Sequence, residues 1–270
     1  MRIIVTDSYK DMSLEATKIV AGQIYLKPNS VLGLATGSTP LGMYENLVAI
    51  HKTVGLDFSQ ATSFNLDEYI GMPPENPQSY HYFMHKNFFD LINMKSENIF
   101  IPDGMAEDVI CAGKAYDALI RQKGGIDLQV LGIGQNAHIG FNEPDVKFEA
   151  TTHKVKLDDE TIQANSRFFQ DEKDVPRYAI SMGIKTIMLA RKVILLAKIW
   201  RREFKLANRI PMIPVLTALT CLFLAAFVFE LATVNADYFI PARVLVGLGA
   251  ICFTLFSIVS ILESGTSGKG

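Results

Sequence analysis

The chain has 270 residues, a formal net charge of −2 and three cysteines. The near-neutral charge gives no reason to expect a nucleic-acid partner, and Cys111, Cys221 and Cys252 are not spaced as a metal site or a redox pair. We therefore expect free thiols in a reducing compartment. The N-terminus has no apolar stretch of signal-peptide length, so we expect a cytoplasmic first domain.

The first 197 residues alternate short β-branched runs with stretches of helical periodicity. The expected strands cover residues 2–5, 31–35, 62–66, 98–102, 128–133, 178–182 and 193–197. The expected helices cover residues 13–25, 40–53, 79–92, 106–122 and 158–169. This alternation predicts an α/β domain with an open, mostly parallel, Rossmann-like sheet and helices on both faces. Ligands in such sheets collect at the carboxyl ends of the strands, where this chain carries four polar clusters.

The first cluster lies between the second expected strand and a helix, and it reads Thr36-Gly37-Ser38-Thr39-Pro40. A small, hydroxyl-rich turn that opens a helix offers free N–H groups to a phosphate, although an ordinary helix cap has the same composition. The second cluster contains the adjacent acids Asp67 and Glu68 at a strand end. We expect at least one of them to enter the ligand crevice, where a carboxylate can act as a general base; a capping or solvated acid is the alternative.

The third cluster follows the strand expected at residues 128–133 and presents Asn136, His138 and Glu143 on one loop. A histidine with a nearby carboxylate is typical of a proton shuttle, and no second histidine or cysteine stands at a metal-ligand spacing. Gly132 and Gly134 form only a fragment of a dinucleotide-binding motif. The fourth cluster contains Arg167, whose guanidinium suits a phosphate but is also common on protein surfaces.

Together the motifs TGSTP, FNLDEY, GIGQNAHIGFNEP and NSRFF resemble those of the glucosamine-6-phosphate deaminase family in order and spacing. The resemblance covers residues 1–197. It implies ring opening, aldose–ketose isomerisation and deamination of glucosamine 6-phosphate to fructose 6-phosphate and ammonium, without a metal or other cofactor.

The same resemblance assigns roles to individual residues. Asp67 would move the proton between C2 and C1, and His138, oriented by Asn136 and Glu143, would open the sugar ring. The phosphate would be held by Arg167 and by the turn Thr36, Gly37, Ser38 and Thr39.

The resemblance stops after residue 197. Family members continue with a serine-glycine-lysine turn whose lysine helps to bind phosphate, whereas this chain has Trp200 at the lysine position. We therefore expect a C-terminally incomplete deaminase domain at residues 1–197, with impaired activity. A membrane-tethered sugar-phosphate-binding protein without turnover, and a related sugar-phosphate lactonase or isomerase, are the alternatives. The sequence is also compatible with a homo-oligomer.

The last quarter of the chain has a different character. Residues 210–229 and 244–262 contain no charged residue, and each stretch is long enough to span a bilayer as a helix. We expect a basic juxtamembrane linker at residues 198–209, a two-helix transmembrane hairpin at residues 210–262, unrelated to the deaminase, and a tail at residues 263–270. The basic linker places both ends of the hairpin in the cytoplasm. A natural fusion, a designed chimera and a gene-assembly artefact would all produce such a junction.

Overall fold

A parallel sheet of five strands forms the centre of the first unit of the chain, Met1–Lys198. The structure is a computed structural model that describes residues 2–134, 138–142, 149–167, 169 and 171–197. The strand order is β4-β2-β1-β5-β8, and every neighbouring pair is parallel. The strands are β1 (Val31–Leu34), β2 (Thr62–Asn65), β4 (Ile99–Phe100), β5 (Leu128–Gly132) and β8 (Val193–Leu196).

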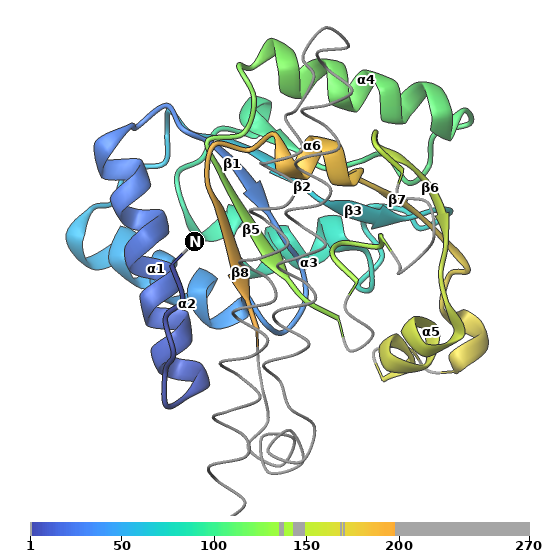
Figure 1. The fold of residues 1–270 in the computed structure, drawn as a ribbon, viewed down its shortest axis with the longest axis horizontal. Coiled ribbons are helices and arrows are strands. Elements are labelled where there is room, and N and C mark those ends of the chain that lie inside the picture. Colours follow the sequence, from blue (N-terminus) through green and yellow to red (C-terminus); the bar gives the residue numbers. More distant parts are fainter. Residues whose placement is uncertain (1, 135–137, 143–148, 168, 170, 198–270) are drawn as a thin grey trace, which may run out of the picture. The chain divides into compact units, whose positions relative to one another are not determined.

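Helices cover both faces of this sheet (Figure 1). Leu32 and Leu34 of β1 pack on one side, into a cluster with residues of α1 (Tyr9–Leu26), α2 (Leu41–Val54) and α3 (Tyr80–Asn87). Val31 and Ala35 pack on the other side, with residues of α4 (Val109–Gln122) and α6 (Ile184–Met188). The alternation follows from strand geometry, since successive side chains point to opposite faces, and a strand buried on both faces is apolar throughout.

A second, antiparallel sheet extends the fold beside the main one, with the order β3-β7-β6. It consists of β3 (Asp67–Tyr69), β7 (Tyr178–Ser181) and β6 (His153–Lys156). The short helix α5 (Asp159–Ser166) follows β6. Single-turn 3-10 helices occur at Phe89–Leu91, Ser96–Asn98 and Glu172–Asp174. Because only Leu66 separates the end of β2 from the start of β3, the small sheet places its side chains next to the carboxyl edge of the large one.

Local sequence signals set several helix boundaries. The Ser79 side chain accepts a hydrogen bond from the Tyr82 N–H at the start of α3, and Asp108 accepts two from the first turn of α4. After α4, Gly125 has a φ of 79° and donates its N–H to the Ile120 carbonyl, a left-handed conformation that favours glycine.

The prediction of a mostly parallel α/β sheet is confirmed, and six of the seven expected strands are present. The strand expected at residues 2–5 is wrong, because no strand lies there and the side chains of Ile3 and Val5 are 67% and 88% exposed. β-branched residues favour a strand only where a neighbouring strand and a buried face are available. The sequence interpretation also missed β3, β6 and α6, and the helix expected at residues 79–92 ends at Asn87.

No helix in the described part of the chain is long and apolar enough to cross a membrane. The hairpin expected at residues 210–262, its linker and its tail lie outside the described residues, as do Cys221 and Cys252. Cys111 is an exposed free thiol, as expected.

Candidate active site

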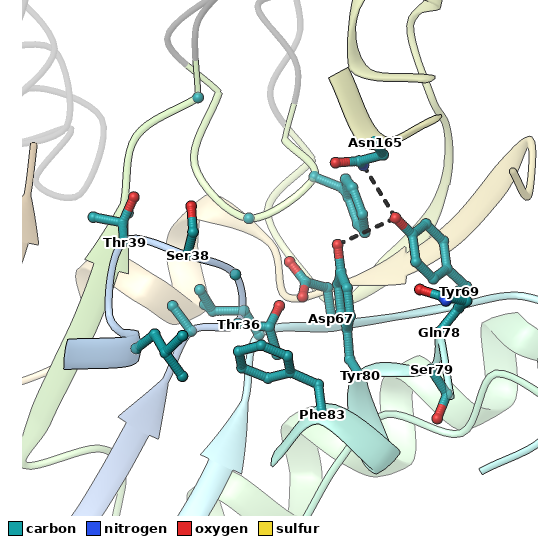
Figure 2. A pocket seen from close by; sticks show the side chains of 18 of the residues that line it. Thr36, Ser38, Thr39, Asp67, Tyr69, Gln78, Ser79, Tyr80, Phe83 and Asn165 are labelled. Atoms are coloured by element: carbon teal, nitrogen blue, oxygen red, sulfur yellow. Dashed lines mark hydrogen bonds between the residues drawn. The ribbon is translucent and has the colours of Figure 1, made fainter. Parts of the chain in front are cut away.

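A cavity of about 320 Å³ opens at the carboxyl end of the central strands. It lies between the turn after β1, the end of β2, the start of α3, the loop after β5 and the end of α5 (Figure 2). Side chains or backbone of seven of the nine expected site residues line it: Thr36, Gly37, Ser38, Thr39, Asp67, His138 and Arg167. The other two, Asn136 and Glu143, lie outside the described residues.

The turn after β1 is built to expose its backbone. Gly37 has a φ of 96°, a left-handed conformation that bends the chain sharply before Pro40 and the start of α2. Tyr9 of α1 braces the turn, because its hydroxyl donates to the Ser38 carbonyl and accepts from the Gly42 N–H, both at 2.8 Å. The hydroxyls of Ser38 and Thr39 and the start of α2 thus border the cavity, as an anion site requires.

Asp67 lies deep in the cavity, with only 5% of its surface exposed. No hydrogen-bond donor among the described residues reaches its carboxylate, and Gly140 approaches it so closely that a Cβ there would lie 3.3 Å from Oδ2. Burial, and then the charge of Glu68, raise the pKa of Asp67 to about 8. Such a carboxyl is a strong base once ionised, and it titrates near neutral pH.

Both neighbouring acids are buried, and only Asp67 lines the cavity. Glu68 is 3% exposed and accepts three backbone hydrogen bonds, from the N–H groups of Tyr69, Tyr80 and His81. The expectation that one acid enters the crevice is met, whereas its neighbour is bound to the start of α3.

An aromatic wall that the sequence interpretation missed borders Asp67. Tyr80 stacks on Phe141 with 5.8 Å between ring centroids, and its ring lies 4.8 Å from that of Tyr69. Asn165 donates to the Tyr69 hydroxyl at 3.0 Å, and the Tyr80 hydroxyl donates to the same oxygen at 3.4 Å (Figure 2). Tyr69 and Asn165 lie within the quoted motifs FNLDEY and NSRFF, which was the available signal; Tyr80 carried none.

The loop after β5 brings His138 to the cavity. Gly134 makes this possible, because a Cβ at that position would overlap the His138 ring, and its N–H donates to the His138 carbonyl. The small sheet anchors the loop: Asn142 donates to the carbonyls of Ile139 and Met182, and the Phe141 N–H donates to Ser181 Oγ. Arg167 reaches the same cavity from the C-terminal end of α5.

The site therefore combines a hydroxyl-rich turn, a buried carboxylate, an imidazole and a guanidinium within one cavity. In the described part of the chain, no three His, Cys, Asp or Glu side chains are grouped so as to bind a metal ion. Such a set of groups can bind an anionic ligand and move protons within it.

Comparison with known proteins identifies relatives of the first unit. The deaminase of Halothermothrix orenii, named glucosamine-6-phosphate deaminase, is 57% identical over 197 residues, which are 73% of this chain and 82% of that protein. The protein of the same name from Clostridium acetobutylicum is 56% identical over 211 residues, 77% of this chain and 88% of its own length.

Solved structures agree with the fold. That of a monomeric glucosamine-6-phosphate deaminase is 43% identical, with a TM-score of 0.71 over 72% of this chain and 81% of that chain. The 6-phosphogluconolactonase of Thermotoga maritima shares the fold at 18% identity, with a TM-score of 0.55, over 78% of this chain and 90% of that chain.

Two family models match the chain. Residues 170–267 match a family described as a protein of unknown function, DUF2776. This match begins inside the deaminase-like fold, before the boundary expected at residue 197. Residues 10–199 match the model for glucosamine-6-phosphate isomerases and 6-phosphogluconolactonases. With this match and relatives at 56–57% identity, the chain belongs to the glucosamine-6-phosphate isomerase/6-phosphogluconolactonase family.

Proposed function

We propose that the chain is a glucosamine-6-phosphate deaminase, which converts glucosamine 6-phosphate and water to fructose 6-phosphate and ammonium. The observation that carries the proposal is the meeting of the turn after β1, Asp67, His138 and Arg167 in one cavity of a chain 57% identical to a named deaminase. The substrate needs a site for its phosphate at one end and a base at the other, and this cavity has both kinds of group.

His138 is the group that we assign to ring opening. The closed sugar has no acidic proton at C2, so the ring oxygen must be protonated and the C1 hydroxyl deprotonated before an aldehyde forms. An imidazole does this work near neutral pH, since it can give one proton and accept another. Asn136 and Glu143 remain the proposed partners that orient it, by the family resemblance.

Asp67 is the proposed base for the isomerisation. Its carboxylate takes the C2 proton of the open aldose, and the resulting enolamine is reprotonated at C1. The ketose imine at C2 then adds water, breaks its C–N bond and releases ammonium. Burial supports the assignment, because a carboxylate with few stabilising contacts is more basic than one in water.

The phosphate is assigned to Arg167 and to the turn Thr36, Gly37, Ser38 and Thr39. Backbone N–H groups and hydroxyls at the start of a helix favour an anion, and a guanidinium adds charge-assisted hydrogen bonds. The aromatic wall lines the same cavity, where it can offer an apolar face to the sugar ring.

The experiment is an assay of ammonium and fructose 6-phosphate release by the full-length chain in detergent. Equal amounts of both products from glucosamine 6-phosphate are expected, with none from glucosamine, which lacks the phosphate. Binding of the substrate without product would favour the non-catalytic sugar-phosphate-binding protein. Hydrolysis of 6-phosphogluconolactone instead would favour a lactonase.

For the rest of the chain we propose the organisation that the sequence predicts. Residues 198–209 form a basic linker, residues 210–262 a two-helix membrane hairpin, and residues 263–270 a tail, with the enzyme domain cytoplasmic. The support is the absence of charge over residues 210–229 and 244–262 and the basic residues before the first stretch. Retention in the membrane fraction after alkaline carbonate washing is expected; release into the supernatant would contradict the hairpin.

A further inference from the structure

Glu68 lies beside the candidate active site, and the proposed chemistry gives it no role. It adjoins the proposed base on β3, it is 3% exposed, and it does not line the cavity. Neighbouring residues of a strand point to opposite faces, so its side chain is directed away from Asp67 and towards the start of α3. Burying a carboxylate raises the free energy of the folded chain unless hydrogen-bond donors stabilise the charge.

Three backbone N–H groups meet the Glu68 carboxylate. Its Oε1 accepts from Tyr69 at 2.8 Å and from Tyr80 at 3.0 Å, and its Oε2 accepts from His81 at 2.8 Å. Tyr80 and His81 are the first two residues of α3, whose N–H groups have no partner within the helix. One side chain thus joins the strand that carries Asp67 to the helix that carries Tyr80.

The backbone around Glu68 is closely packed, which fixes the carboxylate in place. A Cβ on Gly104 would overlap the Tyr69 carbonyl oxygen and lie 3.1 Å from Glu68 Cγ. The Gly71 N–H donates to the Gly104 carbonyl at 2.9 Å, which holds this segment against β3.

We propose that Glu68 is a positioning residue, which holds Tyr80 of the aromatic wall beside Asp67 and keeps a fixed negative charge next to that base. The inference rests on the proposed function, in which Asp67 removes the C2 proton. Glu68 touches no substrate in this account and acts only through its two neighbours.

The charge of Glu68 has a defined effect on Asp67. Burial raises the pKa of Glu68 above its ordinary value, and its three N–H donors offset part of that rise by favouring the ionised form. That charge is the second cause, after burial, of the raised pKa of Asp67. Two ionised carboxylates on adjacent residues repel each other, so the charge of Glu68 makes Asp67 a weaker acid than it would be without this neighbour.

Other groups around Asp67 complete its electrostatic surroundings. Tyr44 of α2, Tyr69 of β3, Tyr80 of α3 and Tyr116 of α4 interact with its charge, and burial raises the pKa of all four, which keeps them neutral. The cationic candidates His138 and Arg167 line the same cavity.

The test compares Glu68→Gln with the wild-type chain and with the control variant Glu97→Gln. Glu97 is an exposed acid on the 3-10 helix Ser96–Asn98, and it does not line the cavity. Without the neighbouring charge, Asp67 ionises more readily. The acid limb of kcat/KM for deamination is therefore expected to shift to lower pH by about one unit. The plateau kcat is expected to fall at least about tenfold, because an amide cannot accept from all three N–H groups. An unshifted limb would overturn the charge role, and an unchanged plateau would overturn the positioning role.

A second variant and a second measurement keep the inference open to refutation. Glu68→Asp retains the charge but shortens the reach to α3, so it is expected to lower kcat and leave the acid limb near its wild-type position; a wild-type kcat would refute positioning. In the ligand-free chain, titration of Asp67 by carbon-13 NMR is expected to move down by about one unit in Glu68→Gln. This readout needs no turnover. Failure of the wild-type chain to release ammonium would thus refute the proposed function alone, and an unmoved titration would refute the role of Glu68.

Discussion

Replacement of Asp67 by Asn is expected to lower turnover and, at alkaline pH, to raise the free energy of unfolding. The substitution keeps the shape of the side chain and removes its ionisation. Turnover should fall by a factor of about 10² to 10⁴ or more, because a positioned general base contributes roughly that much, while substrate affinity should stay within a few fold. The phosphate contacts, which we assign to other residues, should be unaffected.

The same substitution should make the folded chain more stable as pH rises, although it lowers turnover. The pKa of Asp67 is raised to about 8 from an ordinary value of 3.8. Between these values the folded chain holds a proton that the unfolded chain has lost, so wild-type stability falls as pH rises through this window. One pKa unit corresponds to about 1.4 kcal/mol, which gives an upper limit of roughly 6 kcal/mol, and relaxation of the pocket reduces it to about 2–4 kcal/mol.

The assay is urea unfolding followed by far-ultraviolet circular dichroism at several pH values, with Glu97→Gln as the control. Asp67→Asn and wild type should have similar unfolding free energies near pH 4, where both side chains are neutral. The variant should become more stable by about 2–4 kcal/mol near pH 9. A constant difference across this range would refute the buried-carboxyl argument, and near-wild-type turnover by the variant would refute the assignment of the base.

Three further outcomes are expected. His138→Gln should impair deamination more severely with the closed-ring substrate than with an open-chain analogue, and equal losses in the two assays would place its role elsewhere. Arg167→Ala should weaken binding by about 1.5–3 kcal/mol, or roughly ten- to a hundredfold, since it removes a charge-assisted phosphate contact; unchanged calorimetric affinity for a phosphate-bearing ligand would contradict this. Replacing residues 198–270 by a family-type C-terminal segment with its serine-glycine-lysine turn should raise both Tm and activity, because β8 lies at one edge of the described sheet, where Val193 and Leu195 are 43% and 49% exposed. Equal Tm and equal activity of the two chains would mean that the present C-terminal part impairs neither property.

Much of the architecture could be predicted from local pattern. Runs such as Val31–Leu34 are apolar on both faces, which is typical of a strand in a covered parallel sheet, and each alternates with a helical stretch. Turn chemistry predicted the site as well, because small residues after β1 and acids after β2 must meet at the carboxyl edge of the same sheet.

The failures share a physical cause. Residues 2–5 are rich in β-branched side chains yet form no strand, since pairing depends on what lies beside them in space. Conversely β3, with the sequence Asp67-Glu68-Tyr69, has little strand propensity but pairs antiparallel with β7, about 110 residues further along the chain.

The sequence by itself determined the alternation of strands and helices that builds the parallel sheet, the carboxyl-edge clusters and the family resemblance, because these depend on periodicity and short motifs. Only the tertiary structure decided how the two neighbouring acids divide their roles. Asp67 lines the cavity without a described hydrogen-bond donor, whereas Glu68 accepts three N–H groups from its own strand and the start of α3. The pKa of a buried carboxyl depends on the burial and donors that distant segments supply, and these exist only once the chain has folded.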